Sequence, residues 1–253
     1  MFLSLCDRKR FDLRETAIAL VDPLLTYVFQ QLEAVDFQIA EDFQVKANFD
    51  GEIFSLSSSN DFDVEISILP TDFLERINEL GGIDVDFEVS SSLEASIDGS
   101  YCFDGELDQS HYDAPDVGIV NIHLCLKMGK FDQFLFSDLR KSLLGHTVHE
   151  FQHVVQRLFF GSNYQNNDTL EYHVDDIDEI DARVEEIIAM EDDQQKIIND
   201  RDFFVKQLTA YALQYLQRNG ITLQLPEHEK LLQRILVSHV EIFNEKFEKK
   251  EKK

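Results

Sequence analysis

The chain has 253 residues, 43% of them apolar, and its 21 phenylalanines supply enough bulk to fill a sizeable core. The formal net charge of -26 repels phosphate backbones and so argues against nucleic-acid binding, while the same field would attract basic or metal partners. Three cysteines without a C-x-x-C pair indicate neither a disulfide framework nor a cysteine metal site.

The apolar segments are too short to predict a membrane span. The longest, residues 17–29, is interrupted by Asp22 and Pro23 and falls short of the roughly 18 apolar residues that a span needs. The opening MFLSLCDRKR has its basic residues on the wrong side of a short apolar run for a secretory signal. We therefore expect a cytoplasmic protein without a membrane partner.

Two periodicities divide the chain. Apolar residues recur at helical spacing from Thr16 to Gln31. From about residue 43 to residue 127, apolar and polar residues alternate instead, with Asp, Ser and Gly between the alternating runs. The predicted strands are Ile53–Ser58, Phe62–Leu69, Ile83–Ser90 and Ile119–Lys127.

After residue 131 the spacing becomes helical again and remains so. The pair Asn219-Gly220 is a typical C-cap and ends the helix predicted over Asp200–Arg218. We expect an α+β fold, with an N-terminal β-rich region over residues 1–115 and a second region over 116–253, in which one strand is followed by helices that carry the motif described below. A single compact domain is the alternative. The predicted helices cover about Ser137–Phe160, Asp176–Met190, Asp200–Arg218 and Glu227–Phe247.

The most informative stretch is GHTVHEFQHVVQ, residues 145–156, which contains H-E-x-x-H at His149, Glu150 and His153. At about 100° per residue, these histidines share one arc with His146, opposite an apolar arc. Residues four apart lie one turn above each other, so both imidazoles can reach a single cation while Glu150 points beside it. There a carboxylate can take a proton from a zinc-bound water, whose pKa is about 7. A solvated helix face is the alternative interpretation.

In this setting the motif resembles that of the zincin metallopeptidases, whose active-site helix carries H-E-x-x-H with similar uncharged flanks. The resemblance spans about Ile119 to Met190. It implies an endopeptidase rather than an exopeptidase, with zinc bound by His149 and His153 and with Glu150 as general base and later proton donor. The alternating segment Ile119–Lys127 stands where zincins have a substrate-aligning edge strand.

A third zinc ligand is expected on the following helix, because the sequence lacks the further histidine of the metzincins. The segment DEIDARVEEIIAM offers Glu179 in an E-x-x-A pattern, which resembles the gluzincin type and in particular small zincin-like peptidases and anti-repressor proteases of bacteriophages. A helical projection places Glu179 on the flank of a buried arc that includes Ile177. It leaves three other carboxylates facing water: Asp178, Asp181 and Glu185. Further candidates for the third ligand are Glu186 and the loop residues Glu171, His173 and Asp175.

Several other groups are candidates to orient the ligands or to stabilise an oxyanion. His146 lies one turn before Glu150. Thermolysin-type enzymes have an aspartate four residues after the glutamate ligand, whereas this chain has Arg183 there, so its ligands must be oriented differently. The loop between the two site helices adds Tyr164, Tyr172 and His173.

The leading hypothesis is a zinc-dependent peptidase that hydrolyses a peptide or protein substrate through a zinc-activated water. If the protein is phage-encoded, its compartment is the host cytoplasm. The net charge of -26 favours cationic substrates. A non-catalytic phage structural or binding protein that retains a zincin fold is the alternative, and an acidic inhibitor that mimics a polyanion is a third hypothesis. The sequence does not indicate an oligomeric state.

Overall fold

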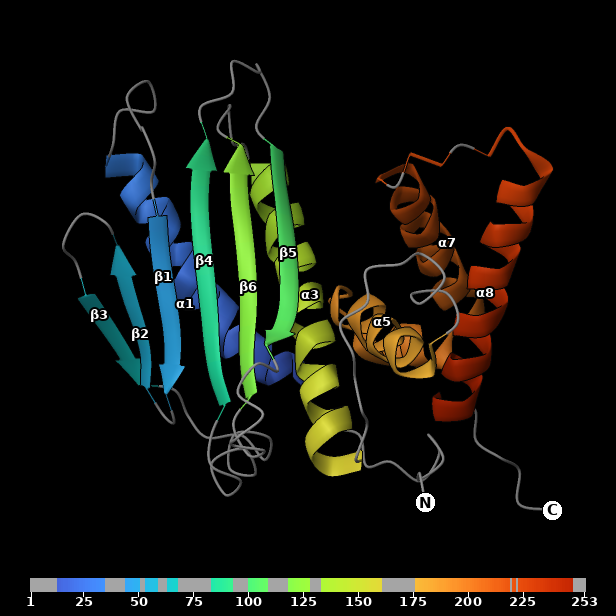
Figure 1. Cartoon of the computed structure of the whole chain (residues 1–253), viewed down its shortest axis with the longest axis horizontal. Helices are drawn as coiled ribbons and strands as arrows, with labels where there is room; N and C mark the ends of the chain where they lie inside the picture. Colours follow the sequence, from blue (N-terminus) through green and yellow to red (C-terminus); the bar gives the residue numbers. More distant parts are fainter. Residues whose placement is uncertain are drawn as a thin grey trace. The chain divides into compact units, whose positions relative to one another are not determined.

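A computed structural model gives the fold of the chain (Figure 1). It describes secondary structure for residues 13–34, for six strands between 44 and 127, for 133–160, and for 176–247 except 219 and 222. Side chains are described for 13–26, 137–156, 176–217, 220–221 and 223–247. Two compact units are present: Phe11–Val154, and Val155–Lys253 together with Met1–Arg10.

The first unit contains a six-stranded sheet with the order β3-β2-β1-β4-β6-β5 (Figure 1). All neighbouring strands are antiparallel except β4 and β6, which are parallel, with Ile83 opposite Gly118 and Ser92 opposite Lys127. The strands are β1 (Gln44–Asp50), β2 (Ile53–Ser58), β3 (Asp63–Ser67), β4 (Ile83–Ser92), β5 (Ser100–Asp108) and β6 (Gly118–Lys127).

The first unit also contains α1 (Leu13–Ala34) and the larger part of α3 (Gln133–Phe160), which contact each other through an ion pair. Arg140 on α3 donates through Nε and Nη2 to the two carboxylate oxygens of Asp22 on α1, at 2.7 and 2.8 Å. The described part of α1 is buried at three- and four-residue intervals, which is the apolar stripe of a helix packed along one face. Its buried apolar residues are Leu13, Ala17, Leu20, Val21, Leu24 and Leu25.

The predicted α+β fold with a β-rich N-terminal half is wrong for the part of the chain whose side chains are described. Those residues are 89% helical, include no strand and form an all-α arrangement. The strands of residues 44–127 are described by their backbone pairing alone. The helix expected from Thr16 to Gln31 and the strand expected at Ile119–Lys127 are present as α1 and β6, but β6 pairs with β4 on one side and β5 on the other and so is not an edge strand. Alternation indicates a strand but does not say which strands pair.

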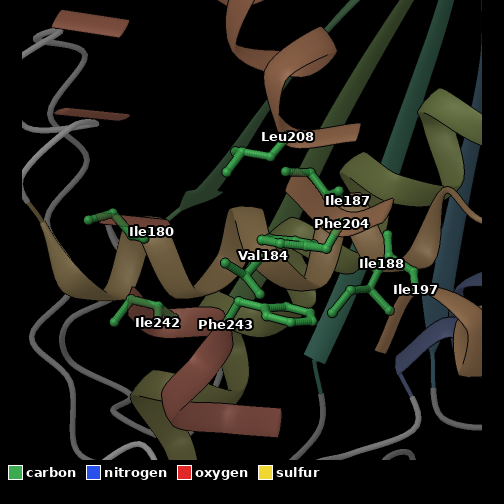
Figure 2. Packing of buried hydrophobic residues seen from close by; sticks show 9 residues of the cluster. All are labelled: Ile180, Val184, Ile187, Ile188, Ile197, Phe204, Leu208, Ile242 and Phe243. Atoms are coloured by element: carbon green, nitrogen blue, oxygen red, sulfur yellow. The ribbon is translucent and has the colours of Figure 1, made fainter. Parts of the chain in front are cut away.

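The second unit contains four helices: α5 (Ile177–Ala189), α6 (Gln194–Asn199), α7 (Arg201–Arg218) and α8 (Pro226–Phe247). Their apolar stripes meet in one core, where the rings of Phe204 on α7 and Phe243 on α8 stack with centroids 4.0 Å apart (Figure 2). Helix α5 supplies four members of this core, which explains how it is held against α7 and α8. The core residues are Ile180, Val184, Ile187, Ile188, Ile197, Phe204, Leu208, Ile242 and Phe243.

The ends of these helices follow local chemistry. Asp176 caps α5, since its Oδ1 accepts from the backbone N–H groups of Asp178 and Glu179 at 2.9 and 3.1 Å. After α7, Gly220 adopts a φ of 71°, and the N–H of Ile221 donates to the carbonyl of Leu216 at 2.9 Å. The expected stop at residues 219–220 is therefore confirmed.

The four helices predicted after residue 131 are present, with ends within four residues of those expected. The short helix α6 was not predicted, because six residues carry too little periodicity. The two compact units divide at Val154 and Val155, inside the continuous helix α3. A division within a helix does not mark a domain boundary, so the predicted boundary at residues 115–116 remains a prediction.

Candidate metal centre

Helix α3 presents two different faces to its surroundings. Val148, Phe151 and Val155 belong to the buried apolar face, as their helical spacing predicts. His149 and His153, one turn apart, are buried as well, and their Nε2 atoms approach to 3.1 Å. Their rings meet edge to face, with an angle of 84° between the planes. The two imidazoles therefore aim their Nε2 atoms at one point rather than at water.

Glu179 completes this group from the first turn of α5. Its side chain is 1% exposed, and its backbone N–H is held by the Asp176 cap. One ligand atom from each of His149, His153 and Glu179 lies within 4.8 Å of the other two. Among the residues that the structure describes, this is the one group of three or more such side chains with the spacing for a metal ion. A buried His-His-Glu group that could hold a metal ion is thus a property of this structure.

The donor set fits a zinc ion. Two nitrogens bound tetrahedrally to zinc at about 2.0–2.1 Å lie roughly 3.3 Å apart. The Nε2 atoms of His149 and His153 are 3.1 Å apart, close to that separation. The same distance suits one N–H···N hydrogen bond between the rings, which metal binding would replace. Two histidines and one glutamate are also the ligand set of several catalytic zinc sites, where a fourth position is left open.

Glu150 follows His149 in the motif and is also buried. Its Oε1 lies 3.8 Å from Nε2 of His146, which is one turn earlier on α3. Its Oε2 is buried and has no hydrogen-bond partner among the described residues. The His146 ring lies parallel to that of His149, with centroids 6.1 Å apart. The structure thus places His146 beside Glu150, where it can orient the carboxylate.

Arg183 lies one turn after Glu179 and contacts it directly. Its Nη2 donates to Oε1 of Glu179 at 2.7 Å, and its Nη1 donates to the hydroxyl of Tyr211 on α7. Burial lowers the pKa of Arg183, but Tyr211 and the carboxylates of Glu179 and Glu186 outweigh this and raise it overall. Burial also raises the pKa of Tyr211. The pair therefore stays a guanidinium cation and a neutral phenol.

The alternative ligand Glu186 faces elsewhere. It is buried, but its Oε2 accepts a hydrogen bond of 3.4 Å from the Tyr211 hydroxyl, and it does not belong to the metal group. Tyr164, Tyr172 and His173 lie outside the described residues, as do the further ligand candidates Glu171 and Asp175.

Three expectations for α5 were wrong. Asp181 and Glu185, expected in water, are 0% and 5% exposed, because α8 packs against that side of α5 and brings Lys246 to both carboxylates. Ile177, expected in the buried arc, is 52% exposed. It is the first residue of the helix, and the helical projection does not take account of where the helix begins.

Sequence reasoning missed four polar residues around the site. Gln156 donates through Nε2 to the carbonyl of Asp178 at 2.7 Å and to Oδ2 of Asp181 at 3.0 Å. A projection at about 100° per residue puts Gln156 on the histidine arc, so this one had a detectable signal. The others come from distant helices without any motif: Tyr211, Tyr215 and Lys246.

No protein-family model matches this chain, and no curated protein or solved structure is significantly similar to it. Within the described residues, none of the helices is both long and apolar enough to span a membrane. The interpretation of the site therefore depends on its own geometry and on the H-E-x-x-H pattern.

Proposed function

We propose that the chain is a zinc-dependent peptidase in which His149, His153 and Glu179 hold the metal and Glu150 moves protons. One observation carries the proposal. The E-x-x-A pattern predicts Glu179 as the third ligand, and its carboxylate lies in a buried group with both motif histidines, with all ligand atoms within 4.8 Å of one another. A random solvated helix face would not bring a distant carboxylate to the two imidazoles.

When bound, zinc supplies a Lewis acid that polarises a carbonyl and acidifies a water. In the proposed hydrolysis, Glu150 takes a proton from the attacking water, whose oxygen forms the new bond to the carbonyl carbon. The carbon–nitrogen bond then breaks, and Glu150 returns the proton to the leaving amine. The position of Glu150 suits this role, because the side chain is buried next to His149 in the motif and its Oε2 has no hydrogen-bond partner among the described residues.

The first test separates proton transfer from metal binding. Glu150→Gln keeps the shape of the side chain, so we expect about one zinc per chain, as in the wild type, together with a loss of hydrolysis of about 10²–10⁴-fold. Zinc content and peptide cleavage are measured on the same folded sample. Retained hydrolysis would remove Glu150 from the mechanism, and zinc without turnover in the wild type would favour a non-catalytic metal-binding protein.

The second test identifies the third ligand. Glu179→Ala should lose zinc, whereas Glu186→Ala should retain it, because the Glu186 carboxylate faces Tyr211. The two variants form a matched pair, since both remove a buried glutamate from the same helix. Zinc lost from the Glu186 variant and kept by the Glu179 variant would contradict the assignment.

We further propose that the substrate is a cationic segment of a peptide or protein, since the formal net charge of -26 attracts positive chains. Cleavage of a lysine-rich peptide should be faster than cleavage of its glutamate-substituted counterpart at low ionic strength, and added salt should reduce the difference. Equal rates on both peptides at low salt would exclude this preference.

A further inference from the structure

The guanidinium of Arg183 is fixed on several sides. One nitrogen donates to Oε1 of Glu179 at 2.7 Å and another donates to the Tyr211 hydroxyl. The Arg183 Cζ atom also lies 5.0 Å from the centroid of the Tyr215 ring, which is cation–π distance. A planar guanidinium that donates two hydrogen bonds in different directions and also contacts an aromatic ring has little rotational freedom. Its contact with Glu179 is therefore directional.

The Glu179 carboxylate depends on this contact in two ways. Because Arg183 holds Oε1, it fixes the plane in which the Glu179 carboxylate presents its lone pairs to a metal ion. The carboxylate is also buried, and the guanidinium forms an ion pair with it inside the fold. Arg183 thus both orients the carboxylate and supplies a counter-ion to it.

We propose that Arg183 is a positioning residue that holds Glu179 as the third metal ligand before the metal arrives, with Tyr211 and Tyr215 fixing the guanidinium. This inference rests on the proposed metal centre and assigns how that centre is assembled. It also explains the choice of arginine, since a lysine ammonium at this position lacks the planar fork that reaches Glu179 and Tyr211 together.

The first experiment measures the zinc dissociation constant by competition with a chelator for the wild type, Arg183→Lys and Arg140→Lys. Arg183→Lys keeps the positive charge, so any repulsion of the metal is unchanged and only the positioning is lost. We expect binding to weaken by about 10–100-fold, the range typical of residues that orient a ligand. Arg140→Lys is the matched control, because Arg140 is on the motif helix α3 and forms a two-bond pair with Asp22 of α1, but lies outside the metal group. It should stay within about twofold of the wild type.

The second experiment measures the thermal stability of the metal-free chain and so does not depend on enzymatic activity. Melting temperatures are measured for Arg183→Met, Glu179→Gln and the double variant. If Arg183 serves Glu179, the loss caused by Arg183→Met should fall to less than roughly half in the Glu179→Gln background. If Arg183 only ties α5 to α7 through the tyrosines, the loss should be the same in both backgrounds, and that result would overturn the proposal.

The outcomes separate this inference from the proposed function. A wild type that binds no zinc would overturn the metal centre and the positioning role together. A wild type that binds one zinc, with Arg183→Lys binding equally tightly, would overturn the positioning role alone and leave the peptidase proposal intact.

Discussion

Helix α5 has two buried charged flanks that look alike in composition and differ in how they are completed. The ligand flank consists of Glu179, Arg183 and Glu186, and the lysine flank consists of Asp181 and Glu185. On the lysine flank, Nζ of Lys246 from α8 lies 2.5 Å from Asp181 and 2.7 Å from Glu185, with Gln156 on the second oxygen of Asp181. On the ligand flank, Glu179 meets one guanidinium and, in the metal group, two imidazoles.

The difference shows that burial alone does not identify a metal ligand. Both flanks bury carboxylates next to a cationic side chain. On the lysine flank, Lys246 forms ion pairs with both carboxylates, Asp181 and Glu185. Imidazoles add no compensating charge while they are neutral, so the group around Glu179 keeps the capacity to take a cation. The two flanks should therefore respond differently to mutation, pH and metal.

The largest effect is expected from Lys246→Met. Burial lowers the pKa of Lys246, but Glu185 and Asp181 outweigh this and raise it overall, so the ammonium is charged. Removing it leaves two buried carboxylates without a counter-ion, which should cost about 3–5 kcal/mol of unfolding free energy in urea titration. The folded fraction should still bind one zinc. Lys206→Met, at an exposed position of α7, should change stability by less than about 0.5 kcal/mol. Equal losses in the two variants would show that the lysine flank is not closed by its ion pairs.

The next effect concerns His239 on α8, a buried histidine near the ligand flank. Burial, and secondly the charge of Arg183, lowers the pKa of His239 to about 4, and its Nδ1 donates to the carbonyl of Ile235 at 2.8 Å. The unfolded chain therefore takes up a proton on this group at higher pH than the folded chain does. Stability from His239 is fully present above about pH 6.5 and is lost as the pH falls toward 4, by about 3 kcal/mol in total.

His239→Gln should remove this part of the pH dependence. Urea titrations at pH 7.5 and pH 4.5 give the change in unfolding free energy with pH for the wild type and for the variant. Because each protein is compared between its own two pH values, the cost of the substitution cancels. A variant that loses as much stability on acidification as the wild type would show that His239 is not held neutral in the fold.

Zinc should stabilise the wild type by mass action. At a free zinc concentration of about 100 times Kd, the expected gain is about 2.7 kcal/mol, seen as a higher melting temperature. Glu179→Ala on the ligand flank should remove most of this gain, whereas Glu185→Gln on the lysine flank should keep it. A gain that depends equally on both residues would remove the distinction between the flanks.

The smallest effect is expected at the start of α5. Asp176→Ala removes the N-cap that accepts from the backbone of Asp178 and Glu179 and should cost about 1 kcal/mol in thermal unfolding. Asp193→Ala removes the equivalent cap of α6, where Oδ1 accepts from the backbone of Lys196 at 3.0 Å, and should cost a similar amount. Only Asp176→Ala should also weaken zinc binding, because it loosens the turn that carries Glu179. Unchanged zinc affinity in this variant would show that the cap does not help to place the ligand.

Part of the candidate site was predictable because it depends on the spacing of residues within a single helix. The four-residue interval of His149 and His153 brings their rings together in any α-helix, and the apolar stripes of α5, α7 and α8 predict those helices without reference to their neighbours. The E-x-x-A pattern added Glu179, which the structure places in the same buried group. The histidine spacing and the apolar stripes follow from the 3.6-residue period, which the sequence alone determines, whereas the choice of Glu179 came from the resemblance of the E-x-x-A pattern to the gluzincins.

Only the tertiary structure decided which polar faces are buried and what satisfies them. Asp181 and Glu185 lie on a flank that a projection of α5 leaves exposed, and they are buried because Lys246 comes from a helix about sixty residues later. Tyr211 reaches Arg183 in the same way from α7. The parallel pairing of β4 with β6 likewise depends on which strands meet, and not on their alternation. Periodicity within one element gives the direction of each side chain. The partners of that side chain come from other elements that tertiary packing brings next to it, and the periodicity of one element does not identify them.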